Sequence, residues 1–296
     1  MTFAYRVWYN LQRMIRVIAA VEAIRRQLAE RGVKIRDLDI PIDDLATTVS
    51  ETGEAELLEP FAVVHVARTG ETMFREFVDG VQMVRAVFRW AGAPCYYGRA
   101  VAVRLTRDET RRLRRAAHES QEWFMTPYAL YTDDSIPILR ELGIVDVDGD
   151  AGANSLVSAA RNTMERRLAR ESNAWCVVDG SRADINNPLV VGVSKTIGMH
   201  LPIETMRTVL NLQVGERTTA FRLPTEPGTV SFYMRLCDRR GDTPHFGLVR
   251  VTVAENAHEP IERIAEWLMV ETRPIATDNH NVLYPMEVVE RHANAL

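Results

Sequence analysis

The stretch "WCVVDGSR", residues 175–182, joins a run of apolar side chains to an acidic turn. Trp175, Cys176 and the two valines that follow suit a buried β-strand, because aromatic and β-branched residues pack well on a sheet. Asp179 stands where this strand should end, and Gly180 follows it. Asp-Gly is a favoured turn sequence, but a carboxylate at a strand end can also bind a metal ion. The stretch alone leaves both interpretations open.

A second segment, "REFVDGV" at residues 75–81, repeats the pattern and places Asp79 and Gly80 after apolar residues. Two such segments suggest that two strands bring carboxylates together. Mg²⁺ and Mn²⁺ prefer oxygen ligands, and a pair of these ions can activate water for phosphodiester cleavage. A third acid, Glu165, lies in a predicted helix at the edge of an apolar stripe. A solvent-exposed Glu165 is the alternative that helical spacing alone favours.

Composition restricts the class of protein. The chain has 296 residues, 46% of them hydrophobic and 26% charged, which is the usual balance for a soluble globular protein. No apolar run is long enough to span a membrane, and three widely spaced cysteines indicate a reduced, cytoplasmic setting. The net charge of −4 gives no general attraction to nucleic acid. Binding to DNA would therefore require a local basic surface.

The pattern of apolar residues predicts an α/β fold with a mixed sheet. We expect an N-terminal helical region over residues 1–60, with a long helix at 4–32, and a main domain over residues 61–296. The main domain is predicted to contain a helical insertion at about 107–170. The other expected elements are strands at 61–67, 72–80, 81–90, 99–105 and 175–179, an antiparallel partner strand at 188–195, three strands between 216 and 254, and helices at 259–271 and from 285 onward.

The C-terminal helix carries a further candidate. Pro285 suits the first helical turn, and His292 follows Val289 by three residues on the predicted inward face. Tyr284 stands just before the helix, where its hydroxyl could reach a cleft. A histidine packed in the core is the simpler interpretation of His292.

Basic residues form a local cluster despite the net charge. Phosphate contacts from this cluster would give DNA affinity without sequence preference, although a solvated surface is an equal alternative. Lys195, at the end of a predicted strand, is a further candidate for a phosphate contact or a simple exposed lysine. The cluster consists of Arg107, Arg111, Arg112, Arg114 and Arg115. Arg217 and Arg222, in the segment "GERTTAFRL", are further candidates.

Together these motifs resemble the NurA nuclease family. The resemblance covers roughly residues 72–296, and its most specific parts are "VVDGSR" followed by "PLVVGVSK", and Tyr284 eight residues ahead of His292. It implies an RNase H-like core related to the PIWI fold, and cleavage of DNA with Mn²⁺ or Mg²⁺. It also implies a homodimer that works with a HerA-type hexameric ATPase.

The resemblance assigns roles to individual residues. The two strand acids fall on Asp79 and Asp179 and the helical acid on Glu165, which makes all three metal ligands. His292 would be a further ligand or would orient water, and Tyr284 would position the phosphate. Val81 stands where the family commonly has Ser, and Arg182 where it often has Leu.

The expected activity is therefore that of a metal-dependent deoxyribonuclease, acting as a 5′–3′ exonuclease, a single-strand endonuclease, or both. It would process DNA ends in recombination repair or anti-phage defence. A non-catalytic RNase H-like adaptor that binds DNA or an ATPase is the main alternative. An Argonaute-like or resolvase-like enzyme is a third.

Overall fold

The computed structural model describes residues 21–31, 35–36, 55–195, 197–198, 200–238, 245–273 and 282–296. Residues 21–30 are helical, as predicted, and the remainder of the helix expected at 4–32 lies outside the described residues. No helix within the described ranges is both long and apolar enough to cross a membrane.

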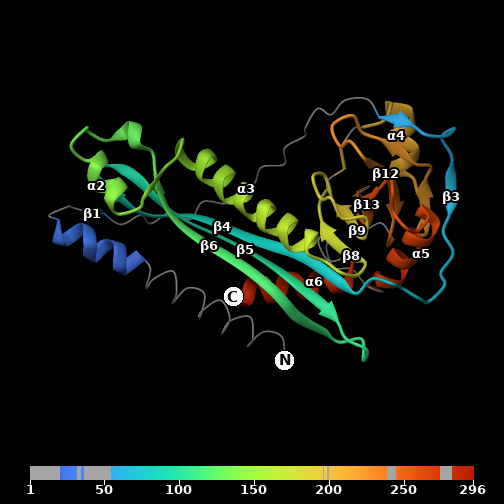
Figure 1. Ribbon diagram of the computed structural model, residues 1–296. Coiled ribbons are helices and arrows are strands. Elements are labelled where there is room, and N and C mark those ends of the chain that lie inside the picture. Colours follow the sequence, from blue (N-terminus) through green and yellow to red (C-terminus); the bar gives the residue numbers. More distant parts are fainter. Residues whose placement is uncertain are drawn as a thin grey trace.

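One large mixed sheet organises the protein (Figure 1). Its first half is a meander of three long antiparallel strands, β4 (Glu76–Trp90), β5 (Ala93–Arg107) and β6 (Leu113–Thr126). On the other side of β4, β8 (Cys176–Asp179) and β9 (Val190–Ser194) run parallel to it. The antiparallel strands β13 (Leu248–Ala254) and β12 (Thr229–Arg235) then continue the sheet. The predicted α/β class with a mixed sheet is confirmed.

Shorter elements complete the described part of the chain. They are β1 (Ile35–Arg36), β2 (Glu56–Leu57), β3 (Val63–His65), η1 (Tyr128–Leu130), α2 (Ile136–Glu141), β7 (Val145–Asp146), α4 (Ile203–Leu210), β10 (Glu216–Thr218), β11 (Phe221–Arg222) and α5 (Ile261–Glu271).

Two helices cover opposite faces of the central strands. Helix α3 (Gly149–Arg170) packs Val157 and Met164 against a cluster that includes Val78. Helix α6 (Tyr284–Ala295) packs Val289 against a different cluster that includes Phe77. Successive side chains of a strand point to opposite faces. Each residue of β4 can therefore be assigned to the α3 face or the α6 face.

Two expectations from the sequence are wrong. Residues 107–125, predicted as a basic helix, mostly form β6, which pairs with β5 from Tyr96 opposite Met125 to Arg107 opposite Leu113. The insertion expected at 107–170 therefore begins as a strand and becomes helical only later. The segments expected as separate strands at 72–80 and 81–90 are the single strand β4. Long-range pairing in the sheet outweighs local helix propensity and the turn preference of Asp-Gly.

Strand β9 also differs from its predicted orientation, because it runs parallel to β8. A parallel neighbour requires the intervening chain to return to the start of the first strand. The loop over residues 180–189 does this around Arg182, whose buried guanidinium donates to the backbone carbonyls of Ile185 at 2.7 Å and Asn187 at 2.9 Å. Arg182 thus has a structural role in this crossover.

The crossover also depends on Gly192 in β9. A Cβ atom at this position would lie 2.6 Å from the backbone nitrogen of Arg182 and 2.7 Å from the carbonyl oxygen of Gly180. Both neighbours are backbone atoms that cannot rotate away.

We expect Gly192→Ala to lower the free energy of unfolding by about 1–3 kcal/mol, the usual cost of overpacking. Urea denaturation would measure the change. Gly152→Ala in α3 is the matched control, because a Cβ there would meet only ordinary contacts from 3.4 Å outward. This control should be neutral or stabilising by up to about 1 kcal/mol. Equal effects of the two substitutions would contradict the explanation.

Candidate functional site

Two aspartates lie side by side at the centre of the sheet. The parallel register pairs Phe77 with Val177 and Val78 with Val178, so Asp79 and Asp179 are the next residues on neighbouring strands, which are spaced about 4.8 Å apart. Asp179 ends β8 as predicted, whereas Asp79 lies inside β4 rather than at a strand end. Alternation places both side chains on the α6 face with Phe77 and Val177. The structure therefore brings the two carboxylates together.

Glu165 reaches the same region from α3, on the opposite face of β4. Its side chain is buried, so the alternative of a solvent-exposed glutamate is wrong. A Cβ at Gly80 would lie 2.5 Å from Oε1 of Glu165. The carboxylate therefore lies against the bare Cα of Gly80, and close approach, not a turn, explains the glycine after Asp79.

Burial opposes the charged forms of Asp79 and Glu165. Desolvation raises the pKa of Asp79 well above its ordinary value, and the negative charges of Asp179 and Glu165 raise it further, while Lys195 opposes them. Desolvation also raises the pKa of Glu165 to about 7, with Arg161 acting in the opposite direction. The charge of Asp179 thus acts on two buried acids whose charged forms are not fully compensated.

Two cations partly neutralise this region. Nζ of Lys195, just after β9, lies 3.1 Å from Oδ2 of Asp179. On α3, Nε of Arg161 lies 3.4 Å from Oε1 of Glu165, which follows it by one helical turn. Lys195 is largely buried, which excludes the simple exposed lysine that the sequence left open.

A pocket of about 280 Å³ lies at the carboxyl ends of β8 and β9, beside α3, and its lining includes both ion pairs but not Asp79. Its polar lining comes from three separate segments of the chain. The lining residues are Arg161, Asn162, Glu165, Arg166, Val178, Asp179, Gly180, Ser181, Ser194 and Lys195.

Arg161 was not among the site residues predicted from the sequence, although its position four residues before Glu165 is a recognisable signal for a helical ion pair. Glu290 on α6, whose charge acts on Lys195, was not predicted either. Glu290 directly follows Val289 on the inward side of the helix, but the sequence did not show that Lys195 would face it.

The two C-terminal candidates, Tyr284 and His292, make no described hydrogen bond to the acids of this site. Tyr284 is the first residue of α6 and is 54% exposed. Nδ1 of His292 lies 2.8 Å from the carbonyl oxygen of Val288 in the preceding turn. Within the described ranges, no hydrogen bond joins either side chain to the three acids, and their roles remain predictions.

Of the predicted DNA contacts, Arg217 is placed unfavourably. Its side chain is buried, forms an ion pair with Glu262, donates to the carbonyl oxygen of Thr218 and lies over the ring of Phe232. The guanidinium is thus used within the fold and is not presented to a ligand, so the expectation for Arg217 is wrong.

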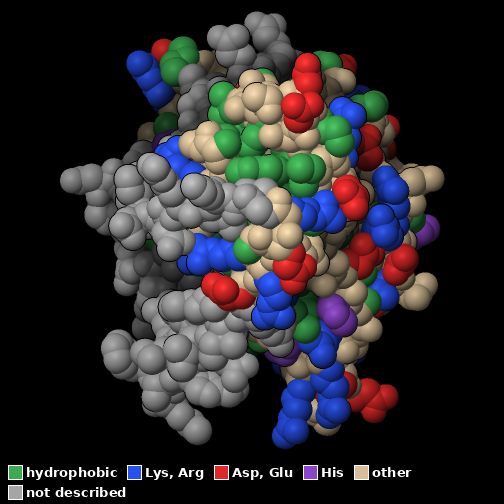
Figure 2. All heavy atoms as spheres, turned by 90° about the vertical axis from the view of Figure 1, so that its left-hand side faces the viewer, with side chains coloured by type: hydrophobic (Ala, Val, Ile, Leu, Met, Phe, Trp, Pro, Cys, Tyr) green, Lys and Arg blue, Asp and Glu red, His purple; other side chains and the backbone are tan. Residues whose placement is uncertain are grey.

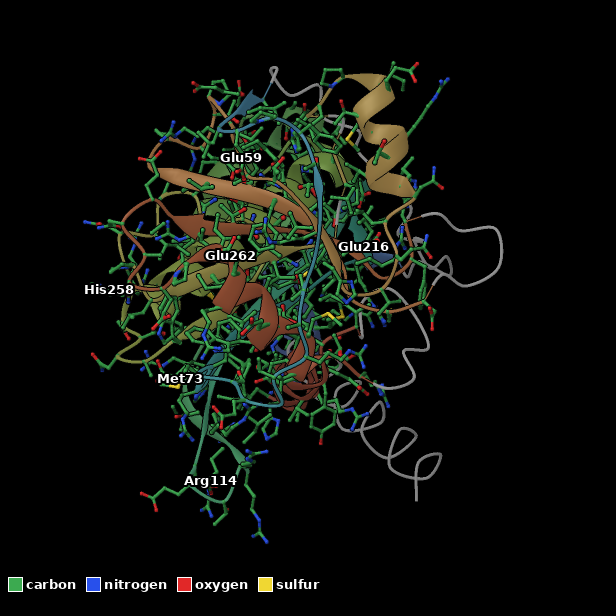
Figure 3. All side chains as sticks on the ribbon, turned by 90° about the vertical axis from the view of Figure 1, so that its right-hand side faces the viewer. Glu59, Met73, Arg114, Glu216, His258 and Glu262 are labelled. Carbon is green, nitrogen blue, oxygen red and sulfur yellow. The ribbon has the colours of Figure 1, made fainter. Side chains whose placement is uncertain are left out.

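Arg111 and Arg115 are exposed near the end of the β5–β6 hairpin. Figure 3 shows Arg114 on this projecting hairpin, and Figure 2 shows basic side chains gathered at the lower end of the molecule. The carboxylate of Asp108 orders the tip by accepting hydrogen bonds from the backbone N–H groups of Thr110 and Arg112, at 2.9 and 3.0 Å. The tip is therefore a defined basic projection.

Among the described residues, no three His, Cys, Asp or Glu side chains are arranged to hold a metal ion. Lys195 and Arg161 lie against two of the acids, and Glu165 approaches from the other face of β4. The donor chemistry nevertheless suits a hard divalent cation, because Asp79, Asp179 and Glu165 all offer carboxylate oxygens. The side chains are thus of the type that binds such an ion, but the described residues do not form a preassembled coordination shell.

Comparison with protein families and with curated protein sequences gives no match to this chain. The geometry of the site, together with the motifs, therefore carries the functional conclusion.

We expect Asp79→Asn to raise the melting temperature at pH 8 in the presence of a chelator. The substitution removes a group whose charged form is opposed by burial and by the neighbouring charge of Asp179, so this cost no longer opposes folding above the ordinary pKa of an aspartate. Glu204→Gln on the exposed side of α4 is the control and should change little. A lower melting temperature for Asp79→Asn would show that its carboxylate stabilises the fold.

Proposed function

We propose that this protein is a divalent-metal-dependent deoxyribonuclease of the NurA type. The observation that carries the proposal is the position of Asp79 beside Asp179 on adjacent parallel strands, with Glu165 packed against Gly80. Two strands and one helix, far apart in the sequence, thus bring the three acids to one region of the sheet, with Glu165 on the face opposite to the two aspartates.

The fold supports this proposal through its order of elements. The three-stranded meander β4–β5–β6 is followed by α3, and then by the parallel strands β8 and β9. The acids lie on the first strand, the helix and the next central strand, which is the order that the NurA resemblance implies. We therefore propose an RNase H-like core for residues 76–194.

The chemistry would be phosphodiester hydrolysis. Asp79, Glu165 and Asp179 would hold Mn²⁺ or Mg²⁺, which lowers the pKa of bound water and neutralises charge on the phosphate. Lys195 lines the pocket and would bind a non-bridging phosphate oxygen as a point charge. We also propose that His292 and Tyr284 orient water and phosphate, as the resemblance implies.

The basic hairpin tip would guide DNA towards the pocket. Arg115 pairs in register with Leu105, only two residues beyond Val103, the partner of Asp79. Exposed arginines here would contact phosphates and would not read bases. This agrees with an enzyme that acts on DNA ends irrespective of sequence.

The proposed biological setting follows from the same resemblance. The protein would act as a homodimer with a HerA-type hexameric ATPase that drives DNA into it. Degradation could proceed as a 5′–3′ exonuclease, as a single-strand endonuclease, or both, in recombination repair or in anti-phage defence.

Wild-type protein should degrade linear DNA in the presence of Mn²⁺, and Asp179→Asn should reduce the rate by at least about 100-fold, because an electrostatic group at the reacting centre is typically worth this much. Gel analysis of end-labelled DNA would measure both rates. Glu204→Gln should retain wild-type activity. Equal rates for wild type and Asp179→Asn would remove Asp179 from the mechanism.

Replacing Arg111 and Arg115 together with Gln should weaken DNA binding and lower the slope of log affinity against log salt by about 1.4–1.8, as expected for two lost phosphate contacts. Fluorescence anisotropy at several salt concentrations would measure the slope. Arg207→Gln, an exposed arginine on α4, is the matched control. An unchanged slope would show that DNA does not follow the hairpin.

A non-catalytic adaptor is the second candidate function. The ion pairs of Lys195 with Asp179 and of Arg161 with Glu165 favour it, because they partly satisfy the carboxylates without a metal. Calorimetric titration with Mn²⁺ separates the two functions. A nuclease should bind Mn²⁺ and lose this binding in the Asp79→Asn variant. For an adaptor, the titrations of wild type and Asp79→Asn should be the same.

A further inference from the structure

Lysine is almost absent from this protein. The sequence contains 36 basic residues of Lys and Arg type, and only Lys34 and Lys195 are lysines, so the other 34 are arginine. Lys34 lies outside the described residues, whereas Lys195 stands in the acidic pocket. The chain thus has one of its two lysines at the centre of its candidate site.

The difference between the two basic side chains is chemical. Arginine presents a planar fork that binds a carboxylate through two parallel hydrogen bonds and holds it in a fixed geometry. The chain uses arginine in this way where it fastens elements together, as in the pair between Arg107 and Glu271, with contacts of 2.6 and 2.7 Å. Lysine is a compact charge on a flexible stem, so it can leave one oxygen and reach another.

The surroundings of Lys195 favour such an exchange. Among the described residues, Nζ donates one hydrogen bond, at 3.1 Å to Oδ2 of Asp179, and the charge of Asp79 also acts on the ammonium. Asp179 keeps 31% of its side chain exposed, and both groups face the same pocket. A divalent cation arriving through this pocket would interact with Asp179 twice as strongly as a single charge at the same distance.

We propose that Lys195 is an exchangeable counter-ion of this site: it neutralises Asp179 until a divalent cation takes its place, and it then binds a phosphate oxygen of the DNA backbone. This inference rests on the proposed function, because it assumes that the acidic site takes up a divalent cation. It explains why carboxylates suited to a metal ion are paired with an amine in the structure. It also assigns to one residue both the competition with metal and the recognition of phosphate.

The scarcity of lysine makes the exchange measurable. In a Lys34→Arg background, Lys195 is the only lysine, so acetylation of its amine can be followed in a single peptide by mass spectrometry. We expect saturating Mn²⁺ to increase the rate of Lys195 acetylation by about tenfold, because the amine leaves its ion pair. Adding a short DNA strand with phosphorothioate linkages, which slow hydrolysis, should return the rate towards its starting value.

Two variants complete the test. In the Asp179→Asn variant, Lys195 should be acetylated rapidly without metal, because its amine no longer has the carboxylate of Asp179 as an ion-pair partner. Lys195→Gln should bind Mn²⁺ about tenfold more tightly than wild type in calorimetry, because a competing charge is gone, and should bind DNA more weakly. Thermal unfolding of each variant shows whether it is folded.

The outcomes separate the inference from the proposed function. Wild type could bind Mn²⁺ without any change in the acetylation rate of Lys195, while Lys195→Gln binds Mn²⁺ with wild-type affinity. Such a result would contradict the exchange of Lys195 but would leave the metal site supported. If only Lys195→Gln binds Mn²⁺, the competition by Lys195 is upheld and the wild-type chain is not a metal enzyme by itself. If neither protein binds Mn²⁺, both proposals are overturned.

Discussion

The parallel pairing of β4 with β8 is the constraint on which the rest of the site depends. Its register aligns Val78 with Val178 and thereby brings Asp79 next to Asp179. Two like charges in a buried position destabilise the fold, so the pairing must be held by other contacts. The apolar clusters under α3 and under α6 provide them on the two faces of the sheet. The acidic site is thus imposed by the packing around it.

Charge compensation in this region comes from side chains that differ in how firmly they are held. Arg161 lies on the same helix as Glu165, one turn away, and moves with it as a unit. Lys195 comes from a different strand than Asp179 and is joined to it by a single contact. The Arg161–Glu165 ion pair therefore forms within one helix, whereas the Lys195–Asp179 ion pair depends on the pairing of β8 with β9. The second pair is the more readily exchanged.

Several features of the site follow from the sequence because they are local. The two Asp-Gly segments identified the central aspartates, Glu165 was found on its helix, and Pro285 correctly indicated the first turn of α6. The main errors concern long-range pairing. The segment rich in Arg, Ala and Glu at 107–125 has helix-forming residues, but β5 offers it a full-length partner and it becomes β6. Arg217 was expected at the surface, and only the tertiary structure shows it buried against Glu262.

By itself the sequence determined which side chains are available: apolar runs that must be buried, acids placed after them, and a single lysine after a strand. These follow from residue identity and spacing over a few positions. Only the tertiary structure decided that β9 runs parallel to β8, that Gly80 makes room for Glu165, and that Lys195 lies against Asp179. Strand register and orientation depend on contacts between residues that are 14 positions apart for Cys176 and Val190 and 100 apart for Glu76 and Cys176, and local preferences do not contain that information.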